Sequence, residues 1–72
     1  MEKFFEVWDI AKRYGLERTV HIADKETYIR IYLDGKTVVR VNGECNNVEH
    51  LYLMAASRLL EYLGERQCTN NA

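Results

Sequence analysis

The side chains with the widest chemical repertoire in this chain are those of His21, Cys45, His50 and Cys68. Structural zinc sites draw histidine and cysteine ligands from closely spaced pairs, and no such pair occurs among these four. A cysteine–histidine catalytic pair would also need a third group to orient the histidine and a cleft to hold the substrate. The sequence indicates neither of them. We therefore expect no catalytic residues, no metal site and no cofactor, and a chain that is not an enzyme.

A second set of residues suits binding rather than catalysis. Tyr28, Arg30 and Tyr32 alternate along the chain, and Lys36 and Arg40 follow at even spacing. Because alternate residues of a strand share one face, we expect these five side chains on one face of a sheet. Tyrosine stacks on bases or fills protein pockets, while arginine and lysine bind phosphates or carboxylates. Three interpretations stay open: an ordinary solvated face, a protein interface and a nucleic-acid surface.

Composition limits the classes of function. The chain has 72 residues, with 10 lysines and arginines against 11 aspartates and glutamates. This length corresponds to one domain with a net stability of about 4 to 10 kcal/mol, too small for a deep active-site cleft. The near-neutral charge gives no overall field that would attract nucleic acid, an anionic membrane or an acidic substrate.

Localisation is expected to be cytoplasmic. No apolar run approaches the roughly 18 residues that span a bilayer. The apolar stretch at the start of the chain is too short and too soon interrupted to be a signal peptide. Sequence distance does not exclude a disulfide between Cys45 and Cys68, but one bridge between a loop and a tail would be unusual in such a chain. We expect no disulfide.

The longest predicted element, which must carry much of the core, is a helix from Val48 to Leu63. Its apolar residues recur at the spacing of one broad helical face. Asn46, with Glu49 three residues later, predicts the start of this helix, and Gly64 predicts its end. We expect a single domain over residues 1–66 and a short flexible tail over residues 67–72.

The remaining elements follow from the change in hydrophobic period. An amphipathic helix is predicted over Glu2–Tyr14, ended by Gly15, and the period then changes to two between Thr19 and Asn42. Short turns at 24–27 and 34–35 divide that stretch into three strands. The predicted fold class is α+β: a two-layer αβββα arrangement in which both helices pack on one face of a three-stranded antiparallel meander.

The second turn determines which residues pair across the last two strands. A two-residue turn at Asp34-Gly35 would place Ile31 opposite Val38 and bring charged side chains onto the apolar face. We therefore predict a three-residue loop with Gly35 as a left-handed bulge, which pairs Ile31 with Thr37 and Ile29 with Val39. The open face would then carry the five aromatic and basic residues, with His21 as a further candidate.

The layout also resembles a known family. The order of helix, three strands and helix, with Ile29–Lys36 as the middle hairpin and Ala55–Gly64 closing, is similar to the double-stranded-RNA-binding domain over residues 4–64. In that family, a basic cluster at the start of the last helix binds phosphates, and a histidine-bearing loop between the first two strands enters the minor groove. This chain has Asn46–His50 and Asp24–Thr27 at those places. The resemblance therefore implies the fold, and a protein-binding role rather than RNA binding.

The long helix has a flank without assured cover. Leu53 and Leu60 lie one heptad apart beyond Ala56, away from the centre of the apolar stripe. Such a flank needs either the first helix or a partner chain. A homodimer through this helix is one expected arrangement.

The functional prediction is a small non-enzymatic protein-binding module that acts as a regulator or inhibitor, of the kind encoded by phages and mobile elements. The alternative is an RNA- or DNA-binding domain that uses the aromatic and basic face of the sheet. No membrane partner is expected. The candidate contact residues are Tyr28, Arg30, Tyr32, Lys36, Arg40, Leu53 and Leu60.

Overall fold

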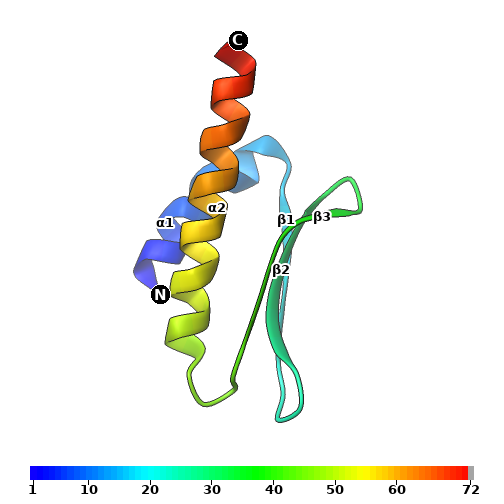
Figure 1. Cartoon of the computed structure of the whole chain (residues 1–72), viewed down its shortest axis with the longest axis vertical. Coiled ribbons are helices and arrows are strands. Elements are labelled where there is room, and N and C mark those ends of the chain that lie inside the picture. The colour runs from blue at the N-terminus through cyan, green and yellow to red at the C-terminus, as the bar shows by residue number, and fades with distance from the viewer. Residues whose placement is uncertain (72) are drawn as a thin grey trace.

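The computed structural model describes the backbone of residues 1–71 and the side chains of residues 1–65. Within these residues the chain forms α1 (Glu2–Ala11), a 3-10 turn η1 (Lys12–Tyr14), β1 (Glu17–Ile22), β2 (Thr27–Leu33), β3 (Lys36–Gly43) and α2 (Val48–Asn71). The strands form an antiparallel sheet in the order β1-β2-β3, and both helices lie on one side of it (Figure 1). The predicted two-layer α+β fold and the meander are confirmed.

The core lies between α2 and the sheet and extends beneath α1. α2 packs over β3 and β2, and α1 packs beside α2. The buried side chains of the sheet include Ile29, Ile31, Val39 and Val41, as the alternating pattern predicts. Those of the helices include Phe4, Val7 and Ala11 from α1 and Leu51, Ala55 and Leu59 from α2.

The first helical segment ends at Gly15 as predicted, but its last three residues form the 3-10 turn η1 and α1 itself ends at Ala11. Gly15 takes a left-handed conformation with φ 86°, and Leu16 folds back into the core. Asp9 pairs on the exposed surface with Lys12 at 3.0 Å and with Arg13 at 3.2 Å. The hydrogen bond and positive charge of Lys12, with a smaller contribution from Arg13, lower the pKa of Asp9.

Both predicted ends of the second helix need correction. The carbonyl of Asn47 accepts a hydrogen bond from the Leu51 N–H at 3.3 Å, so Asn47 rather than Asn46 immediately precedes the helix. Gly64 lies inside α2 and not at its end. Glycine in a helix interior costs only about 1 kcal/mol relative to alanine. A helix can therefore end at a glycine or continue through it. The predicted tail at 67–72 lies outside the residues whose side chains are described.

The register between β2 and β3 also differs from the prediction. Asp34 and Gly35 both have positive φ, 52° and 80°, and form a two-residue turn that pairs Leu33 with Lys36. A shift follows between Ile31 and Tyr32, and beyond it Ile31 pairs with Val39. Positive φ at both central residues defines a type I′ turn, whose twist matches that of the strands it joins. The bulge at Val38 then places Val39 and Val41 on the core face. The predicted three-residue loop was wrong. A two-residue turn followed by a bulge also places the valines of β3 on the same face as Ile29 and Ile31.

On the side of the sheet where the helices pack, they do not cover the end of β1. α2 lies over β2 and β3, and the far end of β1 extends past this cover. Ile22, on the helix side of β1, keeps 47% of its surface exposed, and Val20 is only half-buried. The predicted facing of β1 is correct, but its burial is incomplete.

Candidate interaction surface

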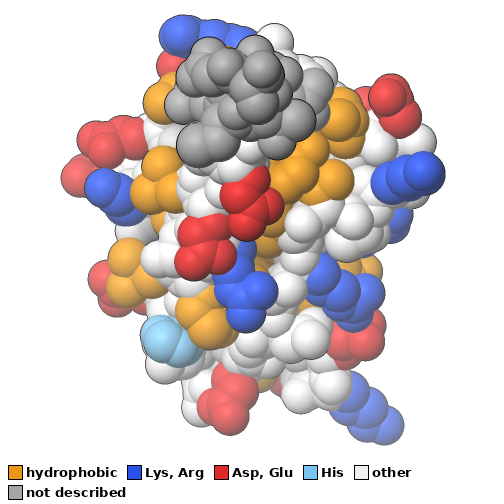
Figure 2. Space-filling model, turned by 45° about the horizontal axis from the view of Figure 1, so that its top comes forward, with side chains coloured by type: hydrophobic (Ala, Val, Ile, Leu, Met, Phe, Trp, Pro, Cys, Tyr) orange, Lys and Arg blue, Asp and Glu red, His pale blue; other side chains and the backbone are white. Residues whose placement is uncertain are grey.

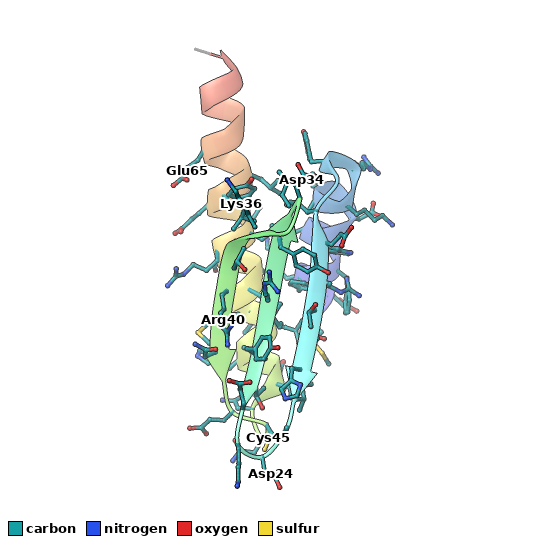
Figure 3. All side chains as sticks on the ribbon, turned by 90° about the vertical axis from the view of Figure 1, so that its right-hand side faces the viewer. Asp24, Asp34, Lys36, Arg40, Cys45 and Glu65 are labelled. Carbon is teal, nitrogen blue, oxygen red and sulfur yellow. The ribbon has the colours of Figure 1, made fainter. Side chains whose placement is uncertain are left out.

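The face of the sheet that points away from the helices carries three cross-strand rows of side chains. Figure 3 views this face, with Arg40 on β3. From β1 to β3 the rows are His21, Tyr28 and Asn42; Thr19, Arg30 and Arg40; and Glu17, Tyr32 and Thr37.

The middle row places two arginines directly opposite each other. Like charges in this position repel, and the two guanidinium groups turn toward opposite ends of the sheet. Arg30 lies over the ring of Tyr32 at 4.8 Å, and its Nε donates a hydrogen bond to Thr37 Oγ1 at 2.5 Å. Arg40 lies over the ring of Tyr28 at 4.4 Å. The face therefore presents two arginine–tyrosine pairs that point apart.

The surroundings of the two pairs are not equivalent. Arg40 lies 3.9 Å from Glu26 Oε2 and donates to Asn42 Oδ1 at 3.4 Å. Arg30 donates a second bond to the carbonyl of Gly35 at 3.4 Å, and among the described side chains no carboxylate lies within 4.0 Å of it. Arg30 is thus a positioned cation whose charge is not balanced by an adjacent carboxylate.

His21 joins this surface from the neighbouring strand. Its ring stacks on Tyr28 with centroids 5.3 Å apart and planes 27° apart. Tyr28 therefore contacts an imidazole on one side and the Arg40 guanidinium on another. The sequence pattern suggested His21 as a candidate, and cross-strand pairing places it there.

Lys36 does not belong to this face. It pairs with Leu33, so it lies on the helix side at the end of β3. Its predicted place beside Tyr32 is taken by Thr37, which the bulge brings opposite that tyrosine. Sequence reasoning missed Thr37 and Asn42 because their places depend on the register. Asp34-Gly35 is a local signal for the two-residue turn that could have been followed, whereas the bulge at Val38 has no comparable signal.

The two candidate leucines lie on the other layer of the molecule. Leu53 and Leu60 on α2 keep 49% and 44% of their surface exposed, so this flank lacks full cover in the described part of the chain, as predicted. Figure 2 shows hydrophobic side chains on both sides of α2, interrupted by charged and polar ones. The predicted contact residues therefore form a cluster of four on the open sheet face, with Lys36 and the leucines apart from it.

Cysteine and acidic groups meet at one end of the sheet. Cys45 is exposed, and its Sγ lies 3.8 Å from Asp24 Oδ1 (Figure 3). Residues 23–27 and 43–46 of the two loops line an open cavity of about 390 Å³. Cys68 lies outside the described side chains, so its pairing stays untested. Among the described residues, no three histidine, cysteine or acidic side chains group to hold a metal ion.

The fold and this surface define a small α+β domain with an aromatic and basic open sheet face. Comparisons with protein-family models, curated proteins and solved structures found no match for this chain. Within its described part, no helix is sufficiently long and apolar to cross a membrane.

Proposed function

We propose that this chain is a non-enzymatic protein-binding module that regulates or inhibits a partner through the open face of its sheet. The observation that carries the proposal is the pair of arginine–tyrosine contacts on a solvent-facing surface. Arginine and tyrosine are among the residues that contribute most binding energy at protein interfaces. Their planar groups combine apolar contact with hydrogen bonding.

Preorganisation supports the same proposal. Stacking on Tyr32 and hydrogen bonds to Thr37 and the Gly35 carbonyl restrain Arg30 before any partner arrives. A side chain that is already ordered loses less conformational entropy when it binds. The matching partner group is a carboxylate beside an apolar or aromatic patch, because Arg30 offers a charge and Tyr32 offers a ring.

Nucleic-acid binding is the second candidate, supported by the same side chains and by the likeness in layout to double-stranded-RNA-binding domains. The segments that would contact RNA in that family are the first hairpin loop and the start of α2; here they carry Asp24, Glu26 and Glu49 against Lys25 and His50. This excess of acidic groups would repel phosphates. An electrophoretic shift with duplex RNA at low salt, weakened steeply by added salt, would favour this candidate over the first.

The test of the first candidate uses the full chain as bait, with captured proteins identified by mass spectrometry. We expect the double substitution Tyr32→Ala with Arg40→Ala to reduce capture of a specific partner at least about tenfold, because each lost hot-spot contact costs about 1–3 kcal/mol. Binding of the purified partner is then measured by calorimetry.

Arg13→Ala provides the matched control, since it removes an exposed arginine from η1 without altering the sheet face. A Leu53→Glu variant tests the helix flank in the same assay. Undiminished capture by the sheet double variant would refute the open face as the contact surface. Loss of capture with Leu53→Glu alone would move the contact to α2.

A further inference from the structure

The outer edge of β1 offers unpaired backbone groups. The Ala23 N–H donates to the Glu26 carbonyl at 3.1 Å, so this pair is hydrogen-bonded across the first hairpin. Hydrogen-bonded and non-hydrogen-bonded pairs alternate along an antiparallel ladder. The N–H and C=O groups of Arg18, Val20 and Ile22 therefore point away from β2. In the described part of the chain no strand pairs with them, and Figure 3 shows β1 as an outer strand.

This edge lacks several of the devices that usually prevent strand addition. Proteins protect free edges with proline, lysine, inward-pointing charges, bulges or very short strands. β1 has six residues and contains neither proline nor lysine, and its pairing with β2 shows no shift. It carries one charge on its helix side, Arg18, whose guanidinium lies over the Phe5 and Trp8 rings. The opposite edge strand, β3, has a bulge at Val38 and carries Lys36 and Arg40. The two edges of the sheet therefore differ in how readily they accept another strand.

Apolar surface beside β1 is also incompletely covered. Ile22 is 47% exposed and Phe5 of α1 is 44% exposed. The Arg18 guanidinium, also on the helix side of β1, lies 5.3 Å from the Phe5 ring and 4.9 Å from the Trp8 ring. An added strand would cover apolar side chains as well as satisfy backbone groups.

We propose that two copies of this chain pair antiparallel along β1, with a twofold axis at Thr19, into a continuous six-stranded sheet. In this register Arg18 of one copy exchanges backbone hydrogen bonds with Val20 of the second copy. That pairing uses only the outward-facing residues identified above.

Side-chain chemistry supports this register. Glu17 of one copy lies opposite His21 of the second copy, and the two Thr19 side chains face each other on the open side. An acidic group opposite a histidine and a threonine pair are both favourable cross-strand neighbours. On the helix side, Ile22 of one copy lies opposite Leu16 of the other and close to its Arg18. Ile22 would there approach the Phe5 and Trp8 rings of the second copy, over which its Arg18 lies.

Pairing through β1 goes beyond the proposed function and does not depend on it. It would join two open faces into one surface with four arginine–tyrosine pairs. A partner with repeated or symmetric sites would then bind more tightly through multivalency.

The test measures molar mass by sedimentation over a range of concentrations. The unaltered chain is expected to reach twice the monomer mass. Thr19→Glu is expected to raise the dimer dissociation constant about tenfold or more, because it places two carboxylates together at the axis. In the monomer the new glutamate faces Arg30, so the fold is retained, as circular dichroism would verify.

Thr37→Glu is the matched control, since Thr37 is an exposed threonine beside Arg30 on the opposite edge strand. It should leave the dimer intact. Glu17→Lys should weaken the dimer, and Glu17→Lys with His21→Glu should restore it. A monomer at every concentration, or a dimer that survives Thr19→Glu but is lost with Leu53→Glu, would overturn the proposal.

Discussion

At the scale of single residues, the backbone of Asp34 and Gly35 determines which side chains meet on the open face. Both residues have positive φ, which permits the two-residue turn, and a bulge at Val38 follows this turn in β3. The bulge places Arg30 opposite Arg40 and Tyr32 opposite Thr37. The geometry of the open sheet face therefore depends on a turn several residues away from it.

The residue-scale prediction concerns Gly35. A Cβ at this position would meet no atom within 4 Å, so Gly35→Ala tests the backbone conformation alone. We expect a loss of about 1–2 kcal/mol in the free energy of unfolding, measured by urea denaturation, because alanine is strained at positive φ. Asp34→Asn should cost nearly nothing, since asparagine tolerates that conformation. Equal stability of the Gly35→Ala protein would contradict the two-residue turn.

At the scale of elements, α2 is longer than the helix that the sequence predicted, which ended at Leu63. A glycine after a periodic run is the usual signal of a helix end, and Gly64 has that position. The structure instead carries the helix through it. Only a left-handed conformation would make glycine necessary at this point, and Gly64 does not adopt one.

The element-scale prediction uses that difference. Gly64 lies within a helix, and a Cβ added there would meet no atom within 4 Å, so alanine encounters no obstacle. Gly64→Ala should stabilise the protein by about 0.5–1 kcal/mol, seen as a higher melting temperature and greater helicity. If Gly64 ended the helix in a left-handed conformation, the same substitution would lower stability. The sign of the change decides between the two arrangements.

At the scale of the whole molecule, a small core is shared between α1, α2 and one face of the sheet. Domains of this size have little stability to spare, so single core residues matter. The adjacent leucines of α2 show this division clearly. Leu59 is fully buried, whereas Leu60 keeps 44% of its surface exposed.

The whole-molecule prediction compares these two leucines. Leu59→Ala should lower the free energy of unfolding by about 2–5 kcal/mol, because it removes buried contacts and leaves a cavity. Leu60→Ala should change it by no more than about 0.5 kcal/mol. Chemical denaturation of both variants provides the measurement. A comparable loss from Leu60→Ala would show that the α2 flank is already buried in solution, for example by a second copy.

Local patterns in the sequence determined the types of the elements, their order and the face to which most side chains belong. The two-residue period of β2 predicted that Ile29 and Ile31 enter the core and that Tyr28, Arg30 and Tyr32 face away. The helical period of α2 likewise predicted the exposed flank at Leu53 and Leu60. These features follow from local periodicity, because adjacent turns of a helix or alternate residues of a strand share a face whatever the rest of the chain does.

Tertiary structure alone decided how the faces are assembled. The pairing of Arg30 with Arg40 depends on the bulge at Val38, and the incomplete cover of Ile22 depends on where the distant helices lie. Lys36 leaves the open face because it pairs with Leu33 across the two-residue turn. Asp34-Gly35 locally favours the two-residue turn, but the bulge at Val38, which places Val39 and Val41 on the core face, depends on packing against α2. The sequence also did not determine where α2 ends. Glycine can either end a helix or lie within one, and α2 continues through Gly64.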